Sequence, residues 1–132
     1  MKWSDEYATG IARVDEQHKM LFKMAEDYRF ALDEGRGERV YSEMLRSLDL
    51  YIRTHFGYEE GCMLKYDCAV AEANKEAHTR FVQVLAGFHQ RYAVAGFDAT
   101  DARNLVDTLD HWLVEHICRI DIRLKDRTAP VP

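Results

Sequence analysis

Proline is nearly absent from this chain of 132 residues. Its two prolines, Pro130 and Pro132, both lie in the last three residues. A proline inside a helix removes a backbone donor and breaks the helix, so the rest of the chain is free to form long helices. No apolar run approaches the roughly 20 residues that a membrane span needs, and the N-terminus lacks the apolar core of a signal peptide. The sequence therefore predicts no membrane span and a cytoplasmic location.

The chain also has few cysteines, and its net charge is negative. The three cysteines, Cys62, Cys68 and Cys118, form neither an even disulfide framework nor a CxxC pair, which is typical of buried or idle thiols in a reducing compartment. The net charge of -5 opposes binding to nucleic acid. The chain has no internal repeat, low-complexity tract or linker. We therefore expect a single domain over residues 1–132, without a nucleic-acid partner, and a monomer rather than an oligomer.

Four segments carry apolar residues at helical spacing. They cover about residues 16–34, 38–64, 70–93 and 100–125, after an N-terminal arm of residues 1–16. Gly35 and Gly96 are expected helix stops, and the segment beginning at Thr100 offers an N-cap. Four helices of roughly 19 to 27 residues with short turns predict an all-α, antiparallel up-down-up-down four-helix bundle.

Polar residues interrupt the apolar stripes. Each stripe holds an imidazole, and two stripes also hold a carboxylate; the residues are His18, His55, Glu59, His78, His116 and Asp121. One buried histidine is usually satisfied by a hydrogen bond, but four helices that direct such groups into one core indicate a shared metal site. Imidazole and carboxylate without thiolate suit iron, manganese or zinc, and the spacing alone does not choose among them.

The spacing of the candidate ligands along two of the expected helices decides whether they can point at one metal site. His55 and Glu59 are four residues apart and share a helix face. His116 and Asp121 are five apart, which separates them by about 140° on a regular α-helix. They converge only if the metal centre lies between their directions or if the helix is locally distorted, for example by a π-bulge.

The order of these residues resembles that of the bacterial hemerythrins. The resemblance extends from Trp3 to about Leu124, and four segments carry it together with Asp121: Val14-Asp15-Glu16-Gln17-His18, His55-Phe56-Gly57-Tyr58-Glu59, Asn74-Lys75-Glu76-Ala77-His78 and Trp112-Leu113-Val114-Glu115-His116. It implies two iron ions bridged by Glu59, by Asp121 and by an oxo or hydroxo group. It also implies that one iron keeps an open position for dioxygen. The histidines divide between the irons, with His18 and His55 on this iron and His78 and His116 on the other.

Asn74 departs from the family pattern, which has a third histidine for the second iron at this position. Three alternatives follow: Asn74 ligates weakly through its oxygen, water fills the position, or Glu76 swings in. We expect Asn74 to be a weak or lost ligand, because Glu76 lies about 200° round the helix from it.

The resemblance also implies a dry oxygen pocket made of residues that flank the ligands. These are Phe56, Phe81, Trp112, Leu113 and Ile117, of which Ile117 is expected to face bound oxygen. Glu60 is expected either to be solvated or to support a ligand from outside the coordination sphere. His89 and His111 are expected to be ordinary helix or surface histidines.

The function implied by the resemblance is reversible dioxygen binding by an oxygen carrier, store or delivery protein, without catalytic residues. The alternative is a di-iron enzyme, such as a peroxidase, an oxidase or a nitric-oxide-reducing protein, made more reactive by Asn74. A third alternative is a metal-depleted or zinc-loaded bundle. The expected partner besides dioxygen is a reductase or an oxygen-consuming enzyme.

Overall fold

The computed structural model describes residues 3–66, 68–69 and 71–117. The expected ligand Asp121, the thiol Cys118 and the expected end of the fourth helix at about residue 125 lie outside these residues.

Four helices make up most of the described chain. They are α1 (Ala12–Asp33), α2 (Gly37–Lys65), α3 (Ala71–Ala95) and α4 (Ala99–Trp112). A 3-10 turn precedes α1 at Asp5–Tyr7, and a π-helical segment, Leu113–Ile117, continues α4.

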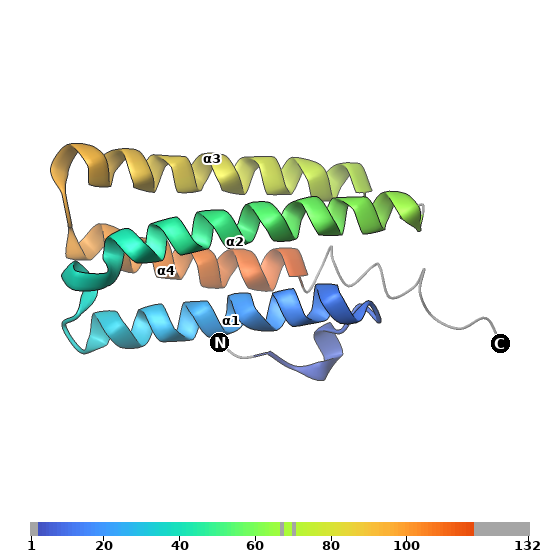
Figure 1. Ribbon diagram of the computed structural model, residues 1–132, viewed down its shortest axis with the longest axis horizontal. Helices are drawn as coiled ribbons and strands as arrows, with labels where there is room; N and C mark the ends of the chain where they lie inside the picture. The colour runs from blue at the N-terminus through green and yellow to red at the C-terminus, as the bar shows by residue number, and fades with distance from the viewer. Residues whose placement is uncertain (1–2, 67, 70, 118–132) are drawn as a thin grey trace.

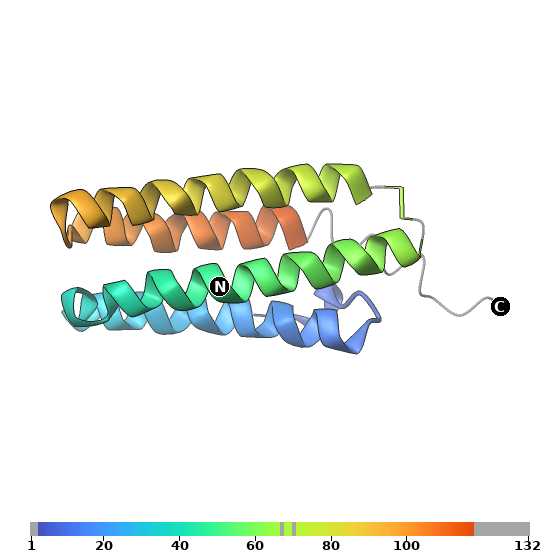
Figure 2. The same cartoon turned by 45° about the horizontal axis from the view of Figure 1, so that its top comes forward.

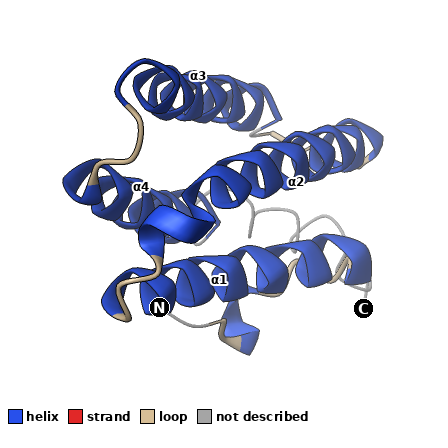
Figure 3. Cartoon of the chain, turned by 60° about the vertical axis from the view of Figure 1, so that its left-hand side comes forward, coloured by secondary structure: helices blue, strands red, loops and turns tan. Residues whose placement is uncertain are grey.

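The four helices form an antiparallel bundle. Successive helices are joined at alternating ends, as Figures 1 and 2 show. Helix α2 packs against α1 and α3, and α4 packs against α1 and α3. The described residues contain helices and loops but no strand (Figure 3). The prediction of an all-α four-helix bundle is confirmed. None of the described helices is both long and apolar enough to cross a membrane.

Helix α1 begins earlier than the sequence predicted, at Ala12 rather than at about Glu16. The Asp15 carboxylate accepts hydrogen bonds from the Thr9 backbone N–H at 2.7 Å and from the Thr9 hydroxyl at 2.9 Å. These bonds fix the chain just before the helix and extend the first turn, so the N-terminal arm is shorter than expected. The arm also packs on α1, because Trp3 and Tyr7 both contact the ring of Phe22.

The ends of the helices follow local backbone chemistry. Gly35 and Gly96 have φ of 73° and 75°, a conformation that glycine adopts without steric cost, and both are confirmed as stops. The N-cap of α4 is Asp98 and not Thr100, since the Asp98 carboxylate accepts from the Asp101 backbone N–H at 2.9 Å. An N-cap at the residue before the first turn satisfies a donor that has no partner within the helix.

Large apolar side chains from all four helices fill the core. The fully buried ones include Leu21, Phe22, Leu48, Ile52, Leu85, Leu105 and Leu109. Helices α1 and α3 begin, and α2 ends, at the same end of the bundle (Figure 1). The polar cluster described below comes from the parts of these helices nearer that end. The rings of Tyr41, Tyr92 and Phe97 pack together toward the other end.

Candidate metal centre

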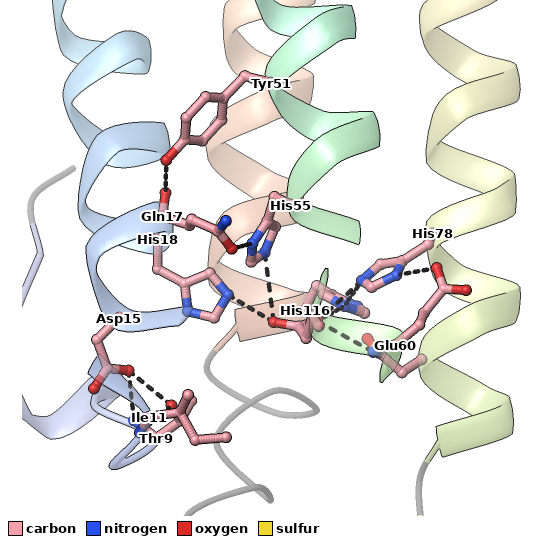
Figure 4. Close-up of polar contacts among 12 residues, drawn as sticks. Thr9, Ile11, Asp15, Gln17, His18, Tyr51, His55, Glu60, His78 and His116 are labelled. Atoms are coloured by element: carbon pink, nitrogen blue, oxygen red, sulfur yellow. Dashed lines mark hydrogen bonds and ion pairs between the residues drawn. The ribbon is translucent and has the colours of Figure 1, made fainter. Parts of the chain in front are cut away.

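Glu59 of α2 lies at the centre of the polar cluster and is fully buried. Its Oε2 lies 2.8 Å from His18 Nε2 and 3.4 Å from His55 Nε2. Its Oε1 lies 3.1 Å from His78 Nε2 and 3.9 Å from His116 Nε2. One carboxylate therefore faces two histidine pairs, one on each oxygen. The four imidazoles come from four separate segments and point toward one another (Figure 4).

The cluster divides into two groups that share Glu59. In the described part of the chain, each group offers ligand atoms that all lie within 4.8 Å of one another. The groups are His18, His55 and Glu59 on one side, and Glu59, His78 and His116 on the other. All five residues are buried. This arrangement offers two adjacent metal positions with a carboxylate between them.

Gln17 fixes the tautomer of His55. Its side-chain oxygen lies 2.7 Å from His55 Nδ1, as Figure 4 shows. An amide oxygen only accepts hydrogen bonds, so Nδ1 carries the proton and the lone pair of the neutral ring is on Nε2, the nitrogen nearer Glu59. The Tyr51 hydroxyl donates a separate hydrogen bond to the backbone carbonyl of Gln17 at 3.2 Å. The sequence offered only one signal for Gln17, its place next to His18.

Glu60 supports His78 in the same way. Its Oε2 lies 2.9 Å from His78 Nδ1, which places the proton on Nδ1 and leaves Nε2 as the ligating atom. Of the two roles expected for Glu60, the structure places it in the supporting one. Glu59 and Glu60, consecutive residues of α2, therefore have different roles. Glu59 points into the cluster, whereas Glu60 accepts a hydrogen bond from the outer nitrogen of the His78 ring.

The positions of the nitrogen lone pairs fit a bound cation. His78 Nε2 lies 3.0 Å from His116 Nε2 and 3.1 Å from Glu59 Oε1. With its proton on Nδ1, His78 Nε2 is an acceptor that faces an acceptor oxygen at hydrogen-bond distance. A metal ion among these atoms replaces that repulsion by coordination. Imidazole and carboxylate donors without thiolate are the set that iron, manganese and zinc take.

The charges of the cluster suit metal ligation as well. Burial lowers the pKa of His55 to about 3, so its imidazole is neutral near pH 7. Burial alone would raise the pKa of Glu59, but its interactions with the surrounding imidazoles of His116, His18 and His78 outweigh burial and hold that pKa well below its usual range. Metal binding requires neutral imidazole and ionised carboxylate, and these are the forms that the fold favours for His55 and Glu59.

His116 lies in the π-helical segment Leu113–Ile117. A π turn pairs residues five apart, whereas an α turn pairs residues four apart. A local distortion of this kind is one of the two conditions under which His116 and Asp121 were expected to converge. Asp121 itself lies outside the described residues.

Asn74 lies inside the cluster and is fully buried. Its Nδ2 donates a hydrogen bond to Glu59 Oε1 at 3.1 Å. Glu76 is exposed to solvent on the outer side of α3. The alternative in which Glu76 occupies the ligand position is therefore wrong for this structure, because its side chain is on the outside of the bundle.

The residues expected to form the pocket lie around the histidines. The ring of Phe56 is parallel to His78, with centroids 3.7 Å apart, and the indole of Trp112 is stacked on His116 at 4.4 Å. These contacts fix the orientation of two imidazoles. Trp112 is half-buried, and the other members of the set are buried: Phe56, Phe81, Leu113 and Ile117. Contact of Ile117 with oxygen stays a prediction.

His89, His111, Cys62 and Cys68 do not belong to either of these two groups. His111 is exposed and His89 is half-buried, and neither belongs to a metal-binding group of the described chain. Cys62 and Cys68 are free thiols.

Known proteins are similar to this chain in sequence and in fold. Residues 9–127 match the hemerythrin HHE cation-binding domain. The chain is 30% identical to a bacteriohemerythrin of Pseudomonas aeruginosa over 87% of its own length and 72% of that protein. It is 30% identical to a bacteriohemerythrin of Methylococcus capsulatus over 92% of its own length and 91% of that protein. A crystal structure of wild-type hemerythrin superposes with a TM-score of 0.80 at 26% identity, covering 98% of each chain.

Fold and site together define a metal-binding four-helix bundle. With the match over most of its length, the chain belongs to the hemerythrin family. Family membership and the two histidine–carboxylate groups are consistent with a non-haem di-iron centre.

Proposed function

We propose that this chain binds dioxygen reversibly at a non-haem di-iron centre and serves as an oxygen carrier, store or delivery protein. The observation that carries the proposal is the placement of Glu59, whose two oxygens each face a separate pair of buried histidines. The similarity to bacteriohemerythrins supports the choice of iron and dioxygen over other metals and ligands.

The chain's own residues have distinct parts in this function. His18 and His55 would hold one iron, His78 and His116 the other, and Glu59 would join them, with Asp121 and an oxo or hydroxo group as the further bridges. When bound, the two irons supply the electrons that dioxygen binding requires. Gln17 and Glu60 keep the ring protons on Nδ1, so that both Nε2 atoms remain available.

The surrounding side chains keep water away from the irons. Phe56 is 4% exposed, Phe81 is 3% exposed, and Leu113 and Ile117 are fully buried, so most of the wall around the cluster is apolar and shielded from solvent. Apolar walls favour a small neutral ligand such as dioxygen and slow irreversible oxidation by excluding water and protons.

The test is reversibility. Protein with a measured iron content is reduced without oxygen, exposed to oxygen, and then purged, while its optical spectrum is followed. We expect the deoxy spectrum to return. Glu59→Ala should fail to load iron, whereas Glu76→Ala on the outside of α3 should behave like the unmodified protein. A spectrum that decays to the ferric form and never returns would contradict the proposal.

A second candidate function follows from Asn74. This buried amide occupies the position of a ligand histidine in the family pattern, and fewer imidazoles on one iron favour reaction over storage. Such a di-iron enzyme would consume added hydrogen peroxide or nitric oxide catalytically, with a reductase as its partner. The oxygen carrier would deliver its ligand to an oxygen-consuming enzyme. Steady-state peroxide consumption by the iron-loaded protein separates the two functions.

A further inference from the structure

The side chain of Asn74 points at the shared carboxylate. We propose that Asn74 is a hydrogen-bond donor to Glu59 and not a metal ligand, so that the metal beside His78 and His116 keeps a coordination position open to a small exogenous anion. This inference rests on the two-metal centre of the proposed function.

The orientation of the amide supports this role. Asn74 Nδ2 lies 3.1 Å from Glu59 Oε1, the oxygen that faces His78 and His116. A carboxylate that joins two metals can accept a hydrogen bond but cannot donate one, so the NH2 group must face it and the amide oxygen must point elsewhere. Among the residues that the structure describes, nothing donates a hydrogen bond to the buried Asn74 Oδ1, so the experiment below also tests whether this oxygen binds the metal.

Other side chains near this metal position are already engaged or turned away. Glu60 accepts from His78 Nδ1, and Glu76 is exposed on the outside of α3. Within the described ranges, the ligand group on this side has three members, Glu59, His78 and His116. Among residues 3–66, 68–69 and 71–117, no carboxylate besides Glu59 therefore belongs to the ligand group on this side.

A surface groove leads toward the same side of the centre. It lies between α3 and α4, has a volume of about 440 Å³, and is lined by Arg80, Phe81, Trp112, Glu115 and His116 among others. His116 belongs to the ligand group, so the groove reaches the side on which the open position is proposed. Its wall carries one positive and one negative charge, from Arg80 and Glu115, so a small polar ligand meets charged side chains as it enters.

Azide, a small anion that binds ferric iron, can count the open positions. We would titrate the oxidised protein, after measuring its metal content, by calorimetry and by optical spectroscopy. Two azide ions per chain are expected for the unmodified protein, one at each metal. Asn74→His should reduce the number to one, and Asn74→Ala should leave it at two. The matched control is Asn104→His on the exposed surface of α4, which should also bind two.

Other outcomes would overturn the proposal. One azide in the unmodified protein and two in Asn74→Ala would show that the amide oxygen is a ligand. One azide in every variant, or one metal per chain, would show that the second open position does not exist. Reversible oxygen binding is measured on the reduced protein, so a failure to release oxygen would leave the azide count unaffected, and the two proposals fail separately.

Discussion

The indole of Trp112 lies nearly parallel to the imidazole of His116, with ring centroids 4.4 Å apart and an interplanar angle of 15°. Trp112 also stacks against Phe81 at 4.6 Å. The first contact holds a candidate ligand in orientation, and the second ties that ligand to α3. The same contact brings a fluorescent ring beside a proposed metal position.

Metal loading should therefore quench the fluorescence of Trp112. The chain has two tryptophans, and the other, Trp3, packs on Phe22 and Tyr7 in the N-terminal arm. We expect Trp3→Phe to retain a strong decrease in emission when iron is added to metal-free protein, and Trp112→Phe to lose most of it. Equal quenching in the two variants would contradict binding at His116.

Replacing Gln17 should weaken metal binding without unfolding the bundle. In Gln17→Leu the Nδ1 proton of His55 loses its acceptor, so the lone pair is no longer held on Nε2. Loss of such a supporting hydrogen bond typically lowers metal affinity by about 10- to 100-fold. Competition with a chelator measures the change. Gln83→Leu on the exposed face of α3 is the matched control, and equal affinities in the two variants would remove Gln17 from the site.

The metal-free protein should lose stability in mild acid. Burial lowers the pKa of His55 from 6.5 to about 3. Below pH 6.5 this imidazole is therefore protonated in the unfolded chain but stays neutral in the folded chain. The unfolded state therefore holds more protons than the folded state below pH 6.5. As the pH is lowered, the free energy of unfolding decreases by at most about 1.4 kcal/mol per pH unit for this group. The pKa of Glu59 is also held below its usual value of 4.5, so its loss has the same sign and begins at lower pH.

Urea denaturation between about pH 7.5 and about pH 5.5 measures this slope. His55→Leu should show a shallower decline, because it removes the group that binds a proton on unfolding. His111→Leu replaces an exposed histidine and should decline as the unmodified protein does. Identical slopes in all three proteins would contradict the assignment of the acid loss to His55.

Asp98 should matter more than Thr100 for the stability of α4. The Asp98 carboxylate caps the helix by accepting from the Asp101 backbone N–H. Loss of such a cap typically costs about 1 kcal/mol, and a surface change elsewhere in the first turn costs within about 0.5 kcal/mol. Urea denaturation of Asp98→Ala and Thr100→Ala compares the two. A larger loss of stability in Thr100→Ala than in Asp98→Ala would show that Thr100 caps the helix, as the sequence suggested.

The sequence predicted the helices well, because one apolar stripe per segment and few helix breakers leave little choice of fold. It also predicted that His18, His55, Glu59, His78 and His116 would come together, since residues in the stripes of one bundle share its core. The structure brings these five side chains together. Metal binding itself and the role of Asp121 remain predictions.

Contacts that depend on how helices pack could not be read from the sequence. Gln17 and Glu60 stand next to ligands in the chain, but adjacency does not say which ring each one contacts. The partner of Gln17 lies on another helix, as does that of Glu60. The early start of α1 has a similar cause, because the bonds between Thr9 and Asp15 join the arm to the helix.

His55 and His78 differ in the charge of the group that accepts the hydrogen bond from their Nδ1–H. The N–H of His55 goes to a neutral amide, and that of His78 goes to a carboxylate. An imidazole backed by a carboxylate is the more basic donor and pushes more electron density toward its metal. The two halves of the centre are therefore electronically unequal, and an iron held beside His78 would be expected to have the lower reduction potential of the two and to be the easier to keep ferric.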